Sequence, residues 1–445
     1  MGLIDTYSGG ITVARILIGT MPTTGHVRPG LDIARALVTA GHDVFWYTGS
    51  RYGDMVRETG ATLLPMSAAV DLDDDTVQQM GISAALKPGL STLKWGLLNL
   101  YIKPVPGWFA EMDEAAKMVQ PDVIVADHAF IAGVFLAEKR GIPSVTFSTT
   151  PLALSSVDTA PFGMGIPPSA SRVGQARNRA LTASVQHVTL ASTQRDANLM
   201  RQSLGLPPLS RFFLDWGVEL ATRYLVATIP EFEYPRSDLP TSVEYIGALI
   251  PPPTTGWTPP AWWPDVAATR ESGRPVIVVT QGSIAREPRK LLLPAIAALA
   301  NEDMLVVATT GGPDPELVLP RSQRPANLRL ERFVPFDRLL PQADVFLTNG
   351  GYGGVQLALT TGVPLVVAGL TEDKTEVSAR VAWSGAGISL GTDDASVKQV
   401  SHGVRTVLAD PRYWYRAREL AQSYARFSAT DLAVEAITTV AAAGR

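Results

Sequence analysis

Short runs of apolar and β-branched residues alternate along this chain with longer segments in which apolar residues recur at helical spacing. The expected buried strands are Ala14–Thr20, Asp43–Thr48, Asp122–Ala126, Ser144–Ser148, Pro275–Thr280, Met304–Thr309, Val345–Thr348 and Leu365–Ala368. The expected helices are Pro29–Ala40, Ile131–Lys139, Arg289–Ala300, Val355–Thr360, Glu376–Ser384 and Val397–Leu408. Strands that alternate with helices are typical of parallel βα units. The pattern therefore predicts the α/β fold class with doubly wound parallel sheets.

A proline- and tryptophan-rich stretch, Pro251–Pro264, separates the two halves of this pattern. Proline stiffens the backbone and lacks the N–H group that a central strand needs, so the stretch is interpreted as a linker. Together with the chain length, it predicts two α/β domains. The expected divisions are a first domain at 1–250, a linker at 251–273, a second domain at 274–409 and closing helices at 410–445. Those helices carry aromatic side chains, and we expect them to pack back across the domain junction onto the first domain.

Composition narrows the classes of function. Of the 445 residues, 46% are hydrophobic and 18% are charged, which favours large buried cores over disorder. The formal net charge of −4 gives no basic excess, so a nucleic acid is not an expected partner. The absence of cysteine excludes disulfides, thiolate metal ligands and a cysteine nucleophile. The chain starts without a signal-peptide pattern, and prolines and lysines interrupt the apolar stretch Leu90–Trp108, so we expect a soluble, cytoplasmic protein without a membrane span.

Polar residues follow two of the expected strands in the first half. Gly25 and His26 come soon after the first strand, and Asp127 follows the strand that ends at position 126. The carboxyl ends of parallel strands share one edge of a sheet, where ligands bind. Histidine suits a general base near neutral pH, and a carboxylate beside it would fix its tautomer and stabilise the imidazolium. Both residues have a structural alternative as helix caps. Strand alternation is expected to point His128 to the opposite side.

Two glycine-rich turns follow expected strands of the second half. Gly282 and Ser283 form the first turn, and Asn349–Gly354 forms the second and opens a helix. Glycines let a ligand approach the backbone closely, and a helix N-terminus offers free N–H groups to a diphosphate. Thr371–Lys374 follows another strand and carries charged groups that can hold sugar hydroxyls. The structural alternatives are turns without a ligand and an exposed charged loop.

The acidic run between Asp71 and Asp75 offers carboxylates in a D-x-D pattern that could hold a metal ion. It lies in a polar loop after a low-complexity stretch, so a solvated acidic turn is the preferred interpretation. We therefore expect no metal site.

Taken together, these motifs resemble those of the family 1 glycosyltransferases with the GT-B fold, which include UDP-glycosyltransferases and bacterial macrolide glycosyltransferases. The similarity covers nearly the whole chain. It is strongest at Gly25-His26 and across Arg332–Arg380, which matches the donor-binding signature of the family. The resemblance implies two Rossmann-like domains that face a central cleft, with the acceptor bound by the first domain and the nucleotide sugar by the second. It implies no cofactor besides the co-substrate, a UDP- or dTDP-sugar.

The resemblance also implies roles for individual residues. His26 matches the catalytic base and Asp127 its carboxylate partner. The implied donor-binding residues are Gly25, Ser283, Phe333, Val334, Asn349, Gly351, Gly353, Gly354, Asp373 and Lys374. Within that set the Phe-Val pair matches the nucleobase site, the serine and glycines match the diphosphate site, and the Asp-Lys pair matches the sugar site. An aromatic, sulfur-rich acceptor site is expected to include Trp95, Trp108, Phe162 and Met164, although any one of them can be an ordinary core residue.

Three positions depart from the family pattern. Asn349 stands where histidine is usual, Leu357 where a glutamate binds the ribose hydroxyls, and Lys374 where glutamine is usual. Leucine cannot accept a hydrogen bond, a loss of about 1–3 kcal/mol, and the adjacent Gln356 is expected to point elsewhere on the helix. A deoxyribose donor such as a dTDP-sugar would tolerate that loss better than a UDP-sugar.

The predicted activity is the inverting transfer of a hexose from a nucleotide diphosphate sugar to a hydroxyl of a small apolar aglycone, such as a polyphenol, macrolide, sterol or lipid. UDP-glucose is the first-choice donor and a dTDP-sugar the alternative. Two other interpretations stay open. One is a non-catalytic homologue that activates a true transferase, and the other is a sugar-nucleotide epimerase or hydrolase on the same fold. A monomer or a homodimer is expected.

Overall fold

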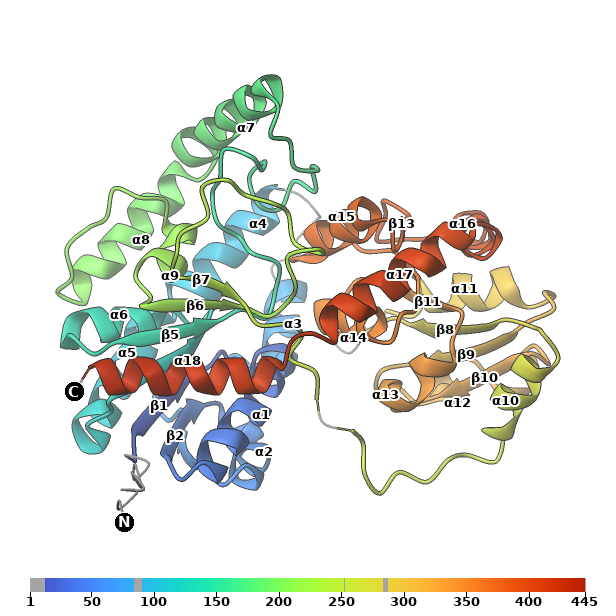
Figure 1. Ribbon diagram of the computed structural model, residues 1–445, viewed down its shortest axis with the longest axis horizontal. Helices are drawn as coiled ribbons and strands as arrows, with labels where there is room; N and C mark the ends of the chain where they lie inside the picture. Colours follow the sequence, from blue (N-terminus) through green and yellow to red (C-terminus); the bar gives the residue numbers. More distant parts are fainter. Residues whose placement is uncertain (1–12, 84–89, 252, 283–286, 445) are drawn as a thin grey trace, which may run out of the picture.

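The computed structural model describes residues 13–83, 90–251, 253–282 and 287–444. These residues form two parallel β-sheets that lie next to each other along the long axis of the molecule, each with helices packed on it (Figure 1). The structure therefore has the two Rossmann-like sheets that the sequence pattern predicts.

The first sheet has seven strands in the order β3-β2-β1-β4-β5-β6-β7, and every pair is parallel. Its strands are β1 (Arg15–Gly19), β2 (Asp43–Thr48), β3 (Thr62–Pro65), β4 (Val123–Asp127), β5 (Ser144–Phe147), β6 (Arg223–Val226) and β7 (Val243–Tyr245). The helices of this half are α1 (Thr24–Thr39), η1 (Ser50–Tyr52), α2 (Gly53–Glu58), α3 (Asp74–Ser83), α4 (Leu90–Gly96), η2 (Leu97–Ile102), α5 (Val105–Val119), α6 (Ile131–Arg140), α7 (Arg172–Ser184), η3 (Val185–Thr189), α8 (Ala191–Ser203), η4 (Phe213–Asp215) and α9 (Trp216–Glu219).

The second sheet has six strands in the order β10-β9-β8-β11-β12-β13, again all parallel. Its strands are β8 (Val276–Thr280), β9 (Leu305–Thr309), β10 (Leu328–Glu331), β11 (Val345–Thr348), β12 (Leu365–Val367) and β13 (Gly387–Ser389). The helices of this half are α10 (Pro264–Glu271), α11 (Leu292–Leu299), α12 (Pro315–Val318), η5 (Arg321–Gln323), α13 (Phe336–Leu339), η6 (Leu340–Gln342), α14 (Tyr352–Thr360), α15 (Lys374–Ser384), α16 (Val397–Ala409), α17 (Pro411–Tyr424) and α18 (Ala429–Ala443).

The central strands are apolar on both faces because helices cover both sides of each sheet. Every residue of β4, β8 and β9 is buried. Parallel strands that are buried on both faces show continuous apolar runs instead of alternation. This explains why these strands could be recognised as short runs of valine, isoleucine and leucine.

The end of the chain crosses from the second half back to the first, as the sequence predicted. Helix α17 packs against α14 of the second half, whereas α18 packs against α1, β4 and β5. Figure 1 shows α18 lying along the first sheet. Its apolar side is part of the first core, where Ala433 and Ile437 are fully buried. The closing helix therefore stabilises a domain distant from it in sequence.

The tryptophan-rich stretch packs against the second half. Trp257, Trp262 and Trp263 are partly buried against the core of the second sheet. The indole N–H of Trp262 donates to Glu331 at 2.7 Å. The stretch connects the two halves along the surface of the second sheet's domain.

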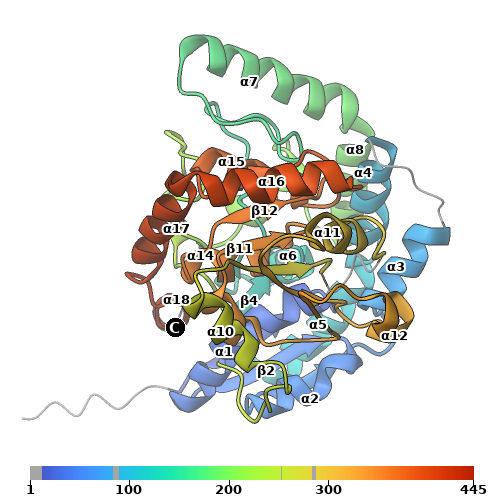
Figure 2. The ribbon, with the colours of Figure 1, turned by 90° about the vertical axis from the view of Figure 1, so that its right-hand side faces the viewer.

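Helix α7 extends away from both sheets in two perpendicular views (Figure 1 and Figure 2). Most of its residues are exposed or half-buried. Across the described ranges, no helix is both long and apolar enough to cross a bilayer.

Candidate active site

His26 and Asp127 meet at the carboxyl edge of the first sheet. β1 and β4 pair in register up to Gly19 and Ala126, so the segment that enters α1 lies next to the end of β4. Nδ1 of His26 lies 2.7 Å from Oδ1 of Asp127. Oδ2 of Asp127 accepts the N–H of Met21 at 2.6 Å. The carboxylate thus bonds the imidazole and also fixes the segment that leads to it.

The surroundings favour an ionised Asp127 beside a basic histidine. Burial would raise the pKa of the Asp127 carboxyl, but the charge and hydrogen bond of His26 lower it overall. Burial would lower the pKa of His26, but the charge and hydrogen bond of Asp127 raise it overall. An ionised carboxylate only accepts hydrogen bonds, so Nδ1 of the neutral imidazole carries the proton and Nε2 keeps its lone pair. The arrangement can remove a proton from a ligand.

His128 lies on the same side as His26, and the prediction from strand alternation was wrong. β4 ends at Asp127, so His128 belongs to the following loop and strand alternation does not set its direction. Its ring stacks on that of His26, with centroids 5.4 Å apart and planes at 23°. The N–H of Thr149 donates to its Nδ1 at 3.3 Å, and its Nε2 lies 3.0 Å from Oγ1 of Thr150. Burial and the charge of His26 lower the pKa of His128 to about 4.

The two threonines were not among the predicted site residues. Oγ1 of Thr149 lies 3.2 Å from Nδ1 of His26, so it contacts both histidines of the site. Thr149 and Thr150 follow β5 at the same sheet edge. A polar pair directly after a predicted strand is the signal from which they could have been found.

Side chains of His26, Asp127 and His128 have ligand-type atoms within 4.8 Å of one another. Their geometry fits hydrogen bonding better than metal binding. The two ring planes are nearly parallel, so their nitrogen lone pairs do not converge on one point, and Nδ1 of His26 is already bonded to the carboxylate. A tetrahedral ion needs converging ligands.

The acidic run of the first domain is not a solvated turn, which corrects the sequence interpretation. Asp74 exposes only 8% of its surface and accepts the N–H of Thr24 at 3.2 Å together with the Thr24 hydroxyl. Arg51 pairs with Asp73 at 2.9 Å and with Asp75 at 2.7 Å. Asp74 therefore satisfies the N-terminus of α1, the helix that carries the site histidine. The pairing escaped prediction because its partners lie 50 residues apart in sequence.

The predicted phosphate-binding turn lies between β11 and α14. Gly351 precedes the helix, and Gly353 and Gly354 lie in its first turn, where backbone N–H groups have no intrahelical partner. No described atom beyond the adjacent residues and the helix's own backbone lies within 4 Å of the point where a Cβ of Gly353 would stand. A ligand could therefore approach this backbone closely. Ser283, the other predicted diphosphate contact, lies outside the described residues.

The side chain of Asn349, in the second glycine-rich turn, lies against Gly282 of the first. It exposes 5% of its surface, and a Cβ at Gly282 would stand 2.7 Å from its Nδ2. Gly282 has φ of +88°, a region that side-chain-bearing residues rarely adopt. A glycine is thus required there both by the backbone and by the asparagine that lies against it.

The nucleoside side of the predicted site contains one exposed aromatic ring. Phe333 exposes 63% of its surface, whereas Val334 is buried in the second core. Gln356 was expected to point elsewhere on the helix than Leu357. It lies at the domain junction, where its Nε2 donates to the carbonyl oxygen of Ala227 at 2.5 Å. Leu357 is half-buried against the second core.

Asp373 and Lys374 lie at the start of α15. Burial raises the pKa of Asp373 to about 6, and the charge of Lys374 partly offsets this rise. Asp373 also contributes to the raised pKa of His26, so the two halves of the molecule meet electrostatically here. Lys374 is buried and pairs with Glu372, whose φ of +55° is uncommon for a residue other than glycine. The lysine charge is therefore neutralised within the turn.

The predicted acceptor residues fall into two groups. Trp108 is fully buried in the first core, and its indole N–H donates to the carbonyl oxygen of Val70 at 2.9 Å, so it offers no surface to a ligand. Trp95 is half-buried in α4. Phe162 is half-buried and Met164 is 41% exposed, both in the loop that follows β5.

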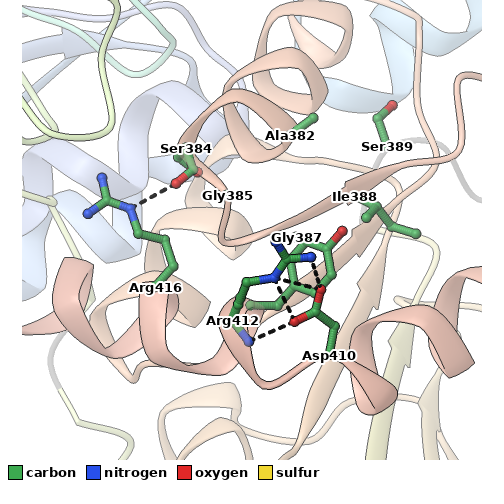
Figure 3. A pocket seen from close by; sticks show the side chains of 10 residues that line it. Ala382, Ser384, Gly385, Gly387, Ile388, Ser389, Asp410, Arg412 and Arg416 are labelled. Carbon is green, nitrogen blue, oxygen red and sulfur yellow. Dashed lines mark hydrogen bonds and ion pairs between the residues drawn. The ribbon is translucent and has the colours of Figure 1, made fainter.

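A separate pocket of about 580 Å³ lies between α15, β13 and α17 (Figure 3). Two arginine side chains line the pocket, and both bond other groups of the protein. Arg412 pairs with Asp410, and Nε of Arg416 donates to the carbonyl oxygen of Ser384 at 2.8 Å. None of the predicted site residues lines this pocket.

Comparisons with known proteins agree with the fold and the motifs. Residues 292–437 match the family profile described as Erythromycin biosynthesis protein CIII-like, C-terminal domain. The chain is 41% identical to the 4'-demethylrebeccamycin synthase of Lentzea aerocolonigenes over 96% of this chain and 99% of that protein. It is 35% identical to UDP-glycosyltransferase 2 of Phaeomoniella chlamydospora over 96% of each. The solved calicheamicin glycosyltransferase CalG4 has a TM-score of 0.72 at 22% identity, with 96% of this chain and 98% of that one covered.

The similarity in structure establishes the shared two-sheet fold, and the identity along nearly the full length of both relatives establishes kinship. The chain belongs to the family 1 glycosyltransferases and is a glycosyltransferase with the GT-B fold.

Proposed function

We propose that this enzyme transfers a hexose, with inversion, from a nucleotide diphosphate sugar to a hydroxyl of a small apolar aglycone. His26 is the general base. The observation that carries the proposal is the hydrogen bond of 2.7 Å between Nδ1 of His26 and Asp127, which keeps the lone pair of the neutral imidazole on Nε2. The site lies where the two domains meet, so a donor on the second domain can face an acceptor on the first.

The proposed reaction is one displacement. Nε2 of His26 removes the proton of the acceptor hydroxyl while the oxygen bonds to the anomeric carbon. The bond from that carbon to the diphosphate oxygen breaks, and its electron pair leaves with the diphosphate. Attack from the side opposite the leaving group inverts the anomeric configuration. Asp127 stabilises the imidazolium, and N–H groups at the start of α14 stabilise the leaving diphosphate.

The name of one relative and the side chain of Leu357 support different donor nucleotides. The relative from Phaeomoniella chlamydospora is named a UDP-glycosyltransferase, which supports a UDP-sugar with UDP-glucose as first choice. Leu357 has no acceptor atom for a ribose hydroxyl, which supports a dTDP-sugar.

A Leu357→Glu variant distinguishes the two donors. If the wild-type enzyme uses dTDP-sugars, the new carboxylate should raise kcat/KM for UDP-sugars relative to dTDP-sugars by about tenfold, since a ribose hydroxyl would gain a charged acceptor. Competition between UDP- and dTDP-sugars in one reaction measures this ratio, with Leu357→Gln as the uncharged control. An unchanged ratio in both variants would contradict a ribose contact at this position.

The proposed acceptor class rests on half-buried and exposed apolar side chains and on the names of the relatives. Phe162 and Met164 present an aromatic ring and a thioether on the loop after β5. The 4'-demethylrebeccamycin synthase and the calicheamicin glycosyltransferase carry natural-product names. We therefore propose a natural-product aglycone, with Phe162, Met164 and Trp95 as contacts.

A nucleotide-release assay tests the proposal. The purified enzyme is given UDP-glucose, other UDP-sugars and dTDP-sugars with a panel of phenolic and polyketide acceptors. Acceptor-dependent release by the wild-type protein and by His402→Ala, an exposed histidine on α16, but not by His26→Ala, is the expected result. Release that needs no acceptor would favour a hydrolase, and release unaffected by His26→Ala would refute the base assignment. Turnover abolished by EDTA would refute a metal-independent mechanism.

A further inference from the structure

A buried ion network joins the two domains beside the proposed site. Nε and Nη2 of Arg380, on α15, donate to Oε1 of Glu233 at 2.9 and 2.5 Å. Nη1 of Arg380 donates to Oε2 of Glu376 at 2.7 Å. Glu233 comes from the first domain, between β6 and β7. The three side chains expose 5% of their surface or less. Buried charges are costly unless paired, so these side chains can be buried at the junction only in an arrangement that keeps their pairing.

The other oxygen of Glu376 bonds a loop of the first domain, residues 161–165, which we call the acceptor loop. Oε1 accepts the N–H of Gly163 at 2.8 Å and the N–H of Gly165 at 2.9 Å. Both glycines have positive φ, 95° and 62°, a conformation that other residues rarely adopt. A Cβ at Gly165 would stand 2.8 Å from Cγ2 of Thr375. The loop therefore sits closely on the first turn of α15.

This contact connects the two sides of the proposed reaction. The acceptor loop carries Phe162 and Met164, which we propose as acceptor contacts. The first turn of α15 carries Lys374, follows Asp373 directly and also holds Glu376. Glu376 thus contacts the acceptor loop through Oε1. Its Oε2 contacts Arg380, which in turn bonds Glu233 at the domain junction.

We propose that Glu376 is a positioning residue that holds the acceptor loop against the donor side, so that the proposed acceptor contacts are in place only when the two domains are in contact. The kinetic consequence rests on the proposed function. Glu376 contacts no reacting atom in this assignment. Its loss frees the loop and weakens capture of the acceptor, whereas the nucleotide sugar and the base keep their surroundings.

Two substitutions and one control separate this role from general stability. Glu376→Ala removes the contacts with the loop and with Arg380, and it leaves Glu233 as the shared partner of two buried arginines, Arg380 and Arg236. A far-UV circular dichroism spectrum and a thermal unfolding curve therefore establish that this variant is folded before its kinetics are compared. Glu376→Gln keeps an oxygen that can accept the glycine N–H groups and should retain part of the function. The control is Glu419→Ala on α17, which removes a mostly exposed carboxylate paired with Arg416.

Steady-state kinetics use the panel acceptor that gives the fastest nucleotide release. Glu376→Ala should raise the KM for that acceptor by about tenfold, because a charged acceptor of two hydrogen bonds is lost. The KM for the donor and kcat should stay within about twofold of wild type, Glu376→Gln should lie in between, and Glu419→Ala should match wild type. Equal changes in the donor and acceptor KM values would overturn the positioning role.

Hydrogen exchange tests the contact without relying on activity. In the ligand-free protein, Glu376→Ala should accelerate amide exchange at residues 162–165 of the acceptor loop by about tenfold or more, with Glu376→Gln affected less and β5 unaffected. Unchanged exchange in this segment would overturn the proposal. Faster exchange together with an unchanged acceptor KM would show that Glu376 holds the loop but does not promote acceptor binding, which would overturn the positioning role. If no donor and acceptor pair reacts, the proposed function fails, and the exchange result still decides whether Glu376 holds the loop.

Discussion

The chemistry proposed for this enzyme depends on how one buried carboxylate changes one imidazole. Burial alone would lower the pKa of His26 and leave a weak base, whereas the charge and hydrogen bond of Asp127 reverse that effect. The carboxylate remains ionised because His26 and the N–H of Met21 stabilise its charge. The pair therefore has to be understood as a unit, since neither residue keeps its properties without the other.

The first prediction concerns the pH dependence of Asp127→Asn. The base must be neutral to accept a proton, so kcat/KM of the wild-type enzyme should rise through a pKa above 6.5. In Asp127→Asn the lowering effect of burial is opposed only by the smaller effects of the Asp373 and Asp74 charges, so the acid limb should move to lower pH. kcat should fall by about 10²–10⁴-fold, because the imidazolium loses its stabilising partner. A pH–rate series on both proteins measures this shift. An acid limb that does not move would contradict the assignment of His26 as the titrating base.

The second prediction concerns how the protonation of His128 makes the stability of the protein depend on pH. The sign of this dependence is opposite to that for His26. Its pKa of about 4 in the folded protein lies below the unfolded value of 6.5, so the unfolded chain binds the additional proton between these values. The contribution of neutral His128 to stability is present above pH 6.5 and is lost as the pH falls toward 4. His128→Gln removes the titrating group, so the stability of wild type relative to this variant should decline by about 3 kcal/mol across that window.

Denaturant unfolding at pH 7, 5.5 and 4.5 measures this difference. His187→Gln, which replaces an exposed histidine of η3, serves as the control. His26 would act in the reverse direction, because a raised pKa gives stability that is present below pH 6.5 and lost as the pH rises through the folded value. A pH-independent difference between wild type and His128→Gln would refute the buried neutral state.

Among the elements, α1 shows how a functional residue depends on a contact far away in sequence. The helix begins at Thr24, ahead of the expected start at Pro29, and its first turn contains His26. Asp74 accepts hydrogen bonds from the backbone and side chain of Thr24. This carboxylate also lies near the positive end of the helix dipole, which favours a negative charge there.

The third prediction is therefore that Asp74→Ala destabilises the protein by about 1 kcal/mol, the usual cost of losing a helix cap, and lowers kcat/KM by disordering the turn that holds His26. Thermal unfolding and nucleotide release measure the two effects. Asp54→Ala is the matched control, because this exposed aspartate pairs with Arg57 within α2 and contacts no site residue. Equal behaviour of the two variants would show that Asp74 does not support α1.

The strands also show which elements can be predicted and why. Expected strands correspond to β1, β2, β4 and β5 of the first sheet and to β8, β9, β11 and β12 of the second. All four edge strands, β3, β7, β10 and β13, were missed, together with β6. Edge strands have one unpaired side, are only three or four residues long here and include exposed or half-buried positions. They lack the continuous apolar run that identifies a strand buried on both faces.

At the scale of the whole molecule, segments that are distant in sequence connect the two domains. α18 adds its apolar side to the first core after α17 has packed on the second domain. At the junction, Gln356 bonds the backbone of Ala227, and the hydroxyl of Tyr424 bonds both Gln356 and Thr228. These contacts are hydrogen bonds between residues of the two domains and of α17.

The fourth prediction tests the contribution of the returning helix. Ile437 is fully buried in the first core, so Ile437→Ala should cost about 2–5 kcal/mol through lost transfer energy and the cavity left behind. Glu435→Ala, at an exposed position of the same helix, should change stability by less than about 0.5 kcal/mol. Chemical denaturation of both variants measures the difference. Similar values would mean that α18 is not an integral part of the first domain.

The sequence by itself determined the α/β class, the two sheets, the position of His26 and Asp127 at strand ends, and the glycine turn before α14. These features depend on local patterns, because a buried strand, a turn and a helix start each require particular residues within a few positions. The family resemblance rested on the same local motifs.

Only the tertiary structure decided how separate segments use those residues. It placed His128 against His26, buried Trp108 in the core, made Asp74 a cap for α1 and brought Glu376 to Gly163, 213 residues away. Each of these outcomes depends on which surfaces come together after the strands have ordered into sheets and the domains have met. Such contacts produce no periodic pattern in the sequence, because the two partners can be separated by any number of residues.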